Sequence, residues 1–574
     1  MADNALIPRF GWLKSYRGVS LLKDGIAGLI LSILLVPQAM AYAQLAGLPP
    51  QMGLFAAMTP PLLYAVFGTS PFVSVGPVAL VSLIVAEASG AAAADPETVV
   101  AIVAIEAGLV LLLIGALGMG RLVNFVSEPV LLGFTAAAAF LIAASQLPTL
   151  LGIETERAGN LPAALSALWQ SLSQVQWTTA LIGIGALIAL MIIHRFAAPL
   201  LWKAGVHPPW RQALAKSLPL AVIIATAFVA MPYGEAVPKV EAVSPGLPGL
   251  PDFGGPGLWL ALLPSGLTVA IIVFVTATAV AKSLAGSDRS GLDTSREAVA
   301  LGAGNIVAAV TGGYAVGASL SRSALVEESG ARSPLASVVG GLVVLATLLF
   351  LAPLLAHLPR TALAALVISA VFGLIKLRDM RAIWRHDRLE AGIIAVAFLA
   401  TVLLGVRLGL AIGAGIGIIH FLWFSSVPRV TRIGSDDGGA SFRSVDRRDV
   451  EIITLPVLAI RIDRSIYFGN AEYVEEQIFK LIARHDDVEC LVLDMRSVNG
   501  IDASGEAMLR RLVERLERAE MTVHFAEAHA PVIEKLKALD PAVCQFHRTV
   551  GEAVSSCGVS LDEVNDDAVG IWPR

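Results

Sequence analysis

The stretch "GASLSRSALVEESG", residues 317–330, lies between long apolar segments and decides how the chain folds. The sequence on either side has the composition of lipid-facing helix, but this stretch offers glycine, four serines and an arginine, Arg322. Arginine keeps its charge in proteins, and an ionisable residue inside a membrane segment usually marks a binding site or a pathway. The alternative is a kinked helix whose arginine extends to the membrane surface.

The composition is that of a membrane protein with many spans. Of 574 residues, 56% are hydrophobic and 15% are charged, and the mean hydropathy is +0.74. A soluble domain carries about 25% charged residues. The sequence therefore predicts that most of the chain lies in lipid.

Charge divides the chain near residue 430. Residues 431–574 hold 26 of the 46 Asp and Glu and 17 of the 41 Lys and Arg, which is typical of a water-soluble domain. The predicted organisation is a cytosolic N-terminal segment (1–23), a transmembrane domain (24–430), a linker (431–444), a soluble domain (445–560) and a C-terminal tail (561–574).

Crossing the hydrocarbon takes about 20 apolar residues as a helix. By that rule we predict spans near 24–45, 52–68, 96–118, 121–148, 176–194, 217–232, 258–286, 294–313, 334–356, 359–376, 389–406 and 408–426. Two more segments, near 72–92 and 314–331, are apolar but interrupted by Gly, Pro or Ser. The expected fold is an α-helical protein of fourteen spans.

The two interrupted segments are the third and the tenth of the fourteen. They occupy matching places in two halves of seven, which indicates an inverted repeat with a binding site at its centre. In the third, "PFVSVGPVALVSLIV" (71–85), an extended stretch gives way at Gly76 and Pro77 to a helical run. Irregular backbone at membrane depth is tolerated only where it is buried or lines a cavity.

Helices that begin inside the membrane direct unpaired N–H groups and the positive ends of their dipoles into its centre. Two such helix starts facing each other form an anion site. Arg322 would add a permanent positive charge, and Ser319, Ser321 and Ser323 would donate hydrogen bonds or cap the helix.

Basic residues predict the orientation. Lys and Arg concentrate in the N-terminal segment and in 195–216 and 376–388, which lie on one side of the membrane in the fourteen-span count. By the positive-inside rule both termini are cytosolic, and we expect the protein in a bacterial inner membrane.

Three blocks of sequence resemble one known family. Residues 36–83, "VPQAMAYAQLAGLPPQMGLFAAMTPPLLYAVFGTSPFVSVGPVALVSL", are similar to the first three spans of the sulfate permease (SulP) family of anion transporters, and "SLSRSALVEESGAR" (319–332) resembles its tenth span. "LVLDMRSVNGIDASGEAMLRRLVERL" (491–516) is similar to the STAS domain shared by sulfate transporters and anti-sigma factor antagonists.

The resemblance implies a seven-plus-seven repeat in which a core domain moves against a gate domain, and a homodimer. It also implies that an anion binds between the third and tenth half-helices, at residues carried over by motif: Gln38, Tyr42, Gly76, Pro77, Val78, Ser319, Leu320, Ser321 and Arg322. For Tyr42 and Val78, ordinary helix packing is the alternative.

The eighth span departs from the family pattern. Many members carry a glutamate in a stretch resembling "FVESISIAK", whereas this chain reads "FVTATAVAK" (274–282), with Thr276 in its place. Thr276 can donate a hydrogen bond to an anion but cannot carry a proton at physiological pH. Symport of a proton through this residue is therefore in doubt.

The tail reads as an α/β domain. "LPVLAIRI", "ECLVLDM" and "MTVHFAE" predict strands, and Met508 to Leu516 predict a helix after "DASG". Ser504 matches the position phosphorylated in the anti-sigma antagonists, although capping this helix is the favoured interpretation. A cytosolic regulatory partner of this domain is one alternative that the sequence leaves open, and the acidic balance argues against nucleic acid.

The cysteines and histidines give no metal or cofactor motif. The spacing of Cys490, Cys544 and Cys557 fits neither a metal site nor a disulfide framework, so we expect free thiols. His524 and His529 lack the spacing and the partners of a zinc site. No phosphate-binding loop or nucleophile elbow is present, so we expect neither an enzyme nor direct drive by ATP.

The sequence thus predicts a secondary transporter of a small inorganic anion, sulfate being favoured, that works by alternating access. The alternatives are transport or exchange of bicarbonate, another oxyanion or a halide, an anion channel, and a membrane sensor that signals through its STAS tail. A nucleobase permease would instead carry paired acids at the eighth and tenth half-sites.

Overall fold

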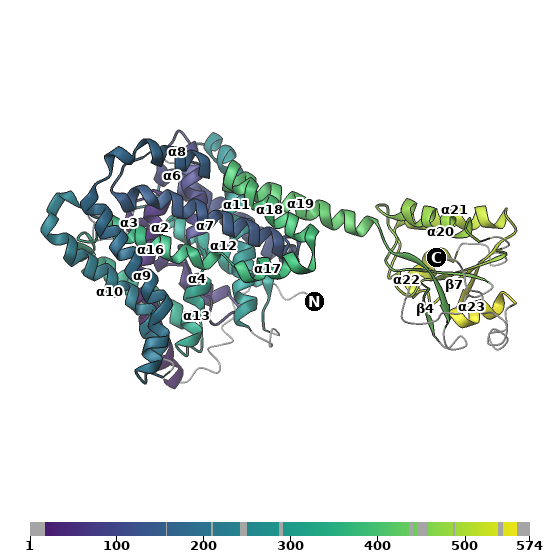
Figure 1. The fold of residues 1–574 in the computed structure, drawn as a ribbon. Coiled ribbons are helices and arrows are strands. Elements are labelled where there is room, and N and C mark those ends of the chain that lie inside the picture. Colours follow the sequence, from purple (N-terminus) through teal and green to yellow (C-terminus); the bar gives the residue numbers. More distant parts are fainter. Residues whose placement is uncertain are drawn as a thin grey trace. The chain divides into compact units, whose positions relative to one another are not determined.

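The structure, a computed structural model, describes residues 18–155, 158–207, 210–241, 249–285, 291–435, 441–445, 457–485, 488–537 and 544–558. The chain divides into two compact units, Met1–Gly417 and Ile418–Arg574. The first is helical apart from two very short strands, and the second is an α/β domain, which confirms the predicted fold class (Figure 1). The predicted segments 1–23 and 561–574 lie largely or wholly outside the described residues.

Eight helices within the described residues are long and apolar enough to cross a membrane. They are α2 (Gly18–Ala46), α6 (Pro96–Ala116), α7 (Glu128–Leu151), α9 (Trp177–Lys203), the segment Leu214–Ala236 that contains most of α10 (Trp210–Ala230), α11 (Pro256–Leu284), the segment Arg360–His386 that contains α16 (Arg360–Val371) and α17 (Leu377–His386), and α19 (Val406–Ser426).

Shorter helices fill the other predicted spans. They are α3 (Pro50–Met58) with α4 (Pro60–Phe67), α5 (Ala79–Ala91), α12 (Thr294–Val310), α13 (Leu320–Glu328), α14 (Leu335–Phe350) with α15 (Ala352–Leu355), and α18 (Arg388–Leu404), while α8 (Leu161–Gln170) lies between predicted spans. The predicted positions are confirmed as helical, and the count of fourteen crossings remains a prediction.

Local sequence sets several helix starts. The side chain of Asp95 accepts hydrogen bonds from the backbone of Glu97 and Thr98 at the first turn of α6. Asp293 and Asp387 cap α12 and α18 in the same way. An aspartate at this position satisfies N–H groups that the helix leaves unpaired, so an apolar run begins at a defined residue.

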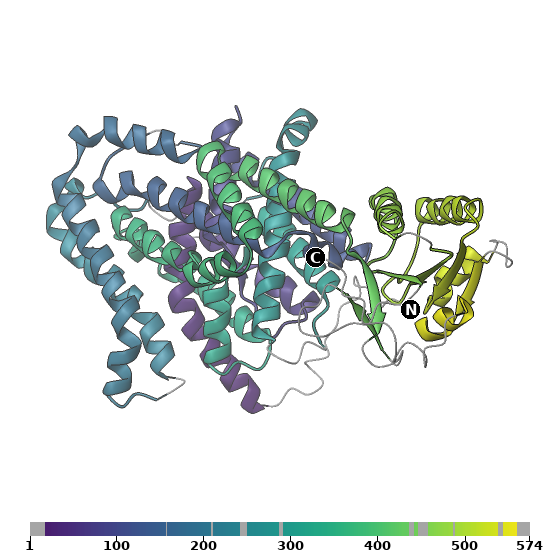
Figure 2. The same cartoon turned by 45° about the vertical axis from the view of Figure 1, so that its right-hand side comes forward.

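The helices of the first unit form two groups. In one, α6 packs against α11 and α12, and α2 packs against α3 and α14. In the other, α7 packs against α16 and α18, and α9 packs against α10 and α16. Figure 2 shows α9 and α10, drawn in blue, as a hairpin at the edge of the bundle. This division fits the core and gate that the family resemblance implies.

The interrupted segments fold as the sequence predicts. Each has an extended stretch that leads into a short helix: β1 (Val75–Gly76) precedes α5, and β2 (Gly317–Ala318) precedes α13. The two strands pair in antiparallel register, Val75 with Ala318 and Gly76 with Gly317. The pairing brings the starts of α5 and α13 together, although they are more than 200 residues apart in sequence.

A six-stranded sheet organises the second unit. Its strands are β3 (Val430–Ser435), β4 (Phe442–Ser444), β5 (Leu458–Ile462), β6 (Cys490–Asp494), β7 (Thr522–Ala526) and β8 (Cys544–His547), in the order β4-β3-β5-β6-β7-β8. Strands β5 to β8 are parallel, while β3 pairs antiparallel with β4 and β5. The three strands expected from the sequence are confirmed, and β3 and β4 fall within or next to the expected linker 431–444.

Alternating residues of β6 build two cores, one on each face of the sheet. Leu491 and Leu493 pack under α20 (Ala471–Ile482) and α21 (Ala503–Glu517), with α22 (Ala530–Leu536) beside them. On the opposite face, Val492 packs under α23 (Val550–Ser556). In Figure 1, α20 and α21 lie on one side of the sheet and α23 on the other. A strand covered on both faces is a nearly continuous apolar run, as residues 490–493 of β6 are.

Candidate functional site

The starts of α5 and α13 form the centre of the candidate site. Val78, in extended conformation, is the residue before α5, and within the described ranges of the chain no side chain caps that helix. Ser319 caps α13, and its hydroxyl accepts from the backbone nitrogen of Arg322 at 3.5 Å. Each helix therefore leaves first-turn N–H groups available, together with the positive end of its dipole.

Arg322 lies fully buried between the two helix starts. Its Nη1 donates to the carbonyl oxygen of Pro77 at 2.8 Å and to Oε1 of Gln38 at 3.5 Å. Its Nε and Nη2 have no hydrogen-bond partner within the described part of the chain. Burial excludes the alternative of an arginine extended to the surface. A buried cation with two unused donors is energetically costly unless an anion neutralises its charge and accepts from those donors. This guanidinium is therefore suited to bind an anion.

Several of the predicted site residues surround Arg322. A Cβ atom on Gly76 would lie 3.4 Å from Nη2 of Arg322, so glycine keeps the space beside this nitrogen open. Gln38 contacts the guanidinium from α2, and Tyr42 lies buried one turn further along the same helix. Val78 packs toward Gly317, at which a Cβ atom would lie 3.1 Å from its Cγ2.

The other residues of the tenth-span motif differ in their surroundings. Leu320 and Ser321 are exposed, and the Ser321 hydroxyl lies 3.2 Å from that of Ser319. Ser323 is buried and accepts from the backbone nitrogen of Ser74 at 2.9 Å. Ser323 therefore joins the two interrupted segments, and Ser321 is the serine that remains accessible.

Thr276 is turned toward its own helix. Its hydroxyl donates to the carbonyl oxygen of Ile272 at 2.7 Å. Val273, one turn before it, lies near β2, since a Cβ atom on Gly317 would be 3.6 Å from its Cγ2. The residue thus lies on the part of α11 that packs beside the site, with its hydroxyl already satisfied.

Sequence reasoning missed the residues that hold the extended stretches in place. The side chain of Asn305 on α12 accepts from the nitrogen of Val316 at 2.9 Å and donates to its oxygen at 3.1 Å. Buried Glu297 accepts from Tyr64 and, at 2.6 and 2.8 Å, from the hydroxyl and nitrogen of Thr69. The available signal was a polar residue inside a predicted apolar span, since Glu297 and Asn305 both lie within the span predicted near 294–313.

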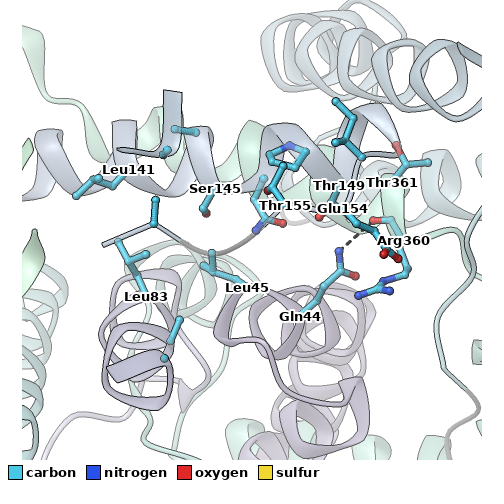
Figure 3. Close-up of a pocket in the computed structure, with 18 of the residues that line it drawn as sticks. Gln44, Leu45, Leu83, Leu141, Ser145, Thr149, Glu154, Thr155, Arg360 and Thr361 are labelled. Carbon is cyan, nitrogen blue, oxygen red and sulfur yellow. Dashed lines mark hydrogen bonds between the residues drawn. The ribbon is translucent and has the colours of Figure 1, made fainter. Parts of the chain in front are cut away.

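A cavity of about 870 Å³ opens between the two groups of helices, near the ends of α2 and α5 (Figure 3). Leu45 and Leu83 form one wall, and Ser145 and Thr149 of α7 lie across from them. The Gln44 side chain donates to the carbonyl oxygen of Arg360 at 3.3 Å, which links the two groups at the rim.

Packed side chains separate this cavity from Arg322. Tyr42, Ala79 and Ile142 belong to one buried apolar cluster that joins α2, α5 and α7. None of the three lines the cavity, although Leu45 and Leu83 are only one turn beyond. The cavity therefore ends close to the helix starts without containing the guanidinium.

In the second unit, Asp502 takes the capping role expected of Ser504. Asp502 Oδ1 accepts from the nitrogen of Gly505 at 2.8 Å, whereas Ser504 is exposed in the first turn of α21. The capping interpretation of Ser504 was wrong, because the residue two positions earlier already occupies the cap. Phosphorylation of Ser504 remains a prediction.

The cysteine interpretation also needs correction. Cys490 and Cys557 are joined as a disulfide, so they are not the free thiols that their spacing indicated. Their sulfur atoms and a ring nitrogen of His524 all lie within 4.8 Å of one another. Sequence spacing could not show this, because α23 brings Cys557 back over the sheet.

These features define a class of protein: a polytopic membrane protein with paired half-helices around a buried arginine, followed by an α/β domain. Residues 21–397 match the Sulfate permease family and residues 449–553 match the STAS domain. The chain belongs to the sulfate permease family and is a multi-pass membrane transporter, not an enzyme.

Known proteins resemble it over most of its length. "Probable sulfate transporter 4.2" of Arabidopsis thaliana is 32% identical over 550 residues, covering 92% of this chain and 80% of that protein. The murine anion transporter Slc26a9 in its inward-facing state has a similar fold, with a TM-score of 0.86 at 20% identity over 95% of this chain and 93% of the other. The transmembrane domain of a cyanobacterial bicarbonate transporter, BicA, matches 70% of this chain and 98% of its own, with a TM-score of 0.57 at 19% identity.

Proposed function

We propose that this protein transports sulfate across a bacterial inner membrane by secondary active transport with alternating access. The observation that carries the proposal is buried Arg322 between two helix starts, whose Nε and Nη2 have no hydrogen-bond partner among the residues that the structure describes. An arginine offers a planar fork of donors that matches an oxyanion. The family, whose relatives include "Probable sulfate transporter 4.2", supports sulfate as the anion.

The mechanism follows from the site's position between two groups of helices. A dianion bound to Arg322 and the first turns of α5 and α13 would neutralise the buried charge. Movement of the helices that carry the site against α7 and α16 would open the packing around Tyr42 and join the site to the cavity of Figure 3. The same movement would close the path on the other side.

Further features of the proposal rest on sequence. Lys and Arg in 195–216 and 376–388 support cytosolic termini, because positively charged loops remain inside. A homodimer, and a regulatory partner for the STAS domain, are proposed from the family resemblance alone.

The test is uptake of radiolabelled sulfate into proteoliposomes that contain the purified protein. Arg322→Ala removes the charge and the free donors, each charge-assisted hydrogen bond being worth roughly 1.5–3 kcal/mol, so we expect uptake to fall at least about tenfold. Arg332→Ala is the matched control: Arg332 is exposed ten residues further on, and its contact with Asp24 is made by the backbone nitrogen, which the substitution retains.

Competing anions and gradients separate the alternatives. Excess bicarbonate or chloride should compete weakly, and strong competition would assign the site to that anion instead. Stimulation by an imposed proton gradient would indicate symport through a group other than Thr276.

Equal uptake by parent and Arg322→Ala would contradict the proposed site, and currents far above carrier turnover would indicate a channel. Absence of flux for every anion would favour the membrane sensor.

A further inference from the structure

Three potential metal ligands meet on one face of the STAS sheet. They are Cys490 at the start of β6, His524 in β7, and Cys557 directly after α23. One ligand atom from each lies within 4.8 Å of the other two. Cys490 and His524 are 6% and 4% exposed, so two of the three side chains are held inside the domain.

The register of β6 against β7 and the position of α23 bring Cys490, His524 and Cys557 together. Val492 pairs with His524, so Cys490, two residues earlier, projects from the same face of the sheet. Val550 and Val554 pack α23 over this face, and the end of that helix places Cys557 above Cys490 with 6.1 Å between their Cα atoms. The cluster therefore joins α23 to the neighbouring strands β6 and β7.

A second imidazole is adjacent. Nε2 of His547, at the end of β8, lies 2.9 Å from Nδ1 of His524, and the two rings stack with centroids 5.1 Å apart. A disulfide alone needs no imidazole beside it. Two sulfurs and two imidazoles in one place have the composition of a tetrahedral structural zinc site.

We propose that Cys490, Cys557 and His524 bind a zinc ion when the cysteine pair is reduced, with His547 as the nearest group to complete the tetrahedron. Thiolate and imidazole are ligands that favour zinc over magnesium or calcium. Bonds of about 2.3 Å to sulfur and 2.0–2.1 Å to nitrogen place tetrahedral ligand atoms roughly 3.3–3.8 Å apart, which is within the spread of this cluster. Binding displaces the thiol protons to solvent and needs no oxidant.

The site would anchor α23 to the sheet. A structural zinc ion stabilises the folded state by its binding free energy, because the unfolded chain does not hold the ligands together. The disulfide and the zinc site use the same sulfur atoms, so only one of them can exist at a time.

The experiment uses the full chain in detergent, reduced with a phosphine, which cleaves the S–S bond and is itself oxidised to the phosphine oxide. Cobalt(II) alone is then added as the probe, and a thiolate-to-cobalt charge-transfer band in the near ultraviolet is expected at one ion per chain. Equimolar zinc should abolish the band, since zinc binds such sites more tightly. Metal analysis after desalting should find one zinc ion per chain.

Variants locate the ligands. Cys490→Ser and Cys557→Ser should each lose the band and the retained zinc, and His524→Ala should weaken zinc binding at least tenfold. Cys544→Ser is the matched control, and it should keep both signals. Zinc should also raise the melting temperature of the parent but not that of Cys490→Ser.

The parent protein alone can overturn the proposal, whether or not a variant folds. If the reduced parent shows three titratable thiols and neither a cobalt band nor retained zinc, the site does not exist. If two thiols stay blocked after reduction, the pair is a disulfide only, which also overturns it. A band that survives in Cys490→Ser but disappears in Cys544→Ser would assign the metal to other residues.

Discussion

Arg322 combines complete burial with an unfinished set of hydrogen bonds. One nitrogen is held by the carbonyl oxygen of Pro77 and by Gln38, which fixes the plane of the guanidinium. The other two nitrogens have no partner among the described residues. A residue that only stabilised the fold would have its donors satisfied, because each unpaired buried group costs about 1–3 kcal/mol. The arrangement therefore stabilises a bound anion and leaves the protein less stable when no anion is bound.

Thr276 gives a sharp test of which side chains contact the anion. Because its hydroxyl already donates to Ile272, we expect Thr276→Val, which keeps the shape and removes the hydroxyl, to leave sulfate uptake within about twofold of the parent. Uptake into proteoliposomes measures this, with Arg322→Ala as the inactive reference. A loss of tenfold or more would show that the hydroxyl turns from its helix to the anion during transport.

At the scale of elements, the packing of α3 on α2 depends on close approach of their backbones. Gly53 in α3 faces α2, where a Cβ atom would overlap the carbonyl oxygen of Ala39. We therefore expect Gly53→Ala to destabilise the protein by about 1–3 kcal/mol, the usual cost of overpacking. Gly25→Ala is the control, because a Cβ atom there meets no atom of the described residues within 4 Å. Thermal unfolding in detergent compares the two, and equal stability would contradict the close packing of α2 on α3.

The cap of α21 gives a prediction that depends on pH. The backbone N–H groups of Gly505 and Phe468 lower the pKa of Asp502 below its ordinary value. A lowered pKa means that the carboxylate stabilises the folded state above its unfolded pKa of about 3.9, and that this stability is lost as pH falls through the folded pKa. Asp502→Ala should therefore cost about 1 kcal/mol near pH 7 and progressively less below about pH 4.

Ser504→Ala is the matched control for this cap. Ser504 is exposed and does not cap the helix, so its replacement should change the free energy of unfolding by less than about 0.5 kcal/mol. Thermal unfolding of the STAS unit within the full chain measures both variants. A larger effect at Ser504 than at Asp502 would restore the interpretation of Ser504 as the cap.

The sequence predicted elements better than contacts between them. Glycine and proline at 76–77 and the serines at 319–323 break apolar runs, so their half-helices could be read directly. The pairing of β1 with β2 and the contact of Arg322 with Pro77 could not, because they join residues more than 200 positions apart. The interpretations of Ser504 and Cys557 failed for other reasons. Asp502, two residues before Ser504, already caps the helix, and the return of α23 over the sheet decides which cysteines meet.

At the scale of the whole molecule, the site and the cavity lie in one path with packing between them. Ser321 is exposed beside Arg322 at the start of α13. The segment that follows α13 is held near the first turns of α2, because the side chain of Asp24 accepts from the backbone nitrogen of Arg332. The cavity lies at the other end of α2, beyond Tyr42. Asp24 and Gln44 are twenty residues apart, or about 30 Å of helix, which is the thickness of the hydrocarbon. Ser321 and the cavity should therefore be reached from opposite sides.

Cysteine accessibility tests this arrangement. We expect Leu83→Cys to react with a membrane-impermeant thiol reagent from the side of loop 234–256, and Ser321→Cys to react from the side of the termini. Saturating sulfate should slow both reactions at least about threefold in the parent background but not in Arg322→Ala, because only the intact site holds the anion between them. The native cysteines all lie beyond residue 489, so the unsubstituted protein supplies the background rate. Reaction of both positions from the same side would contradict alternating access through this path, and simultaneous rapid reaction from both sides would indicate a channel.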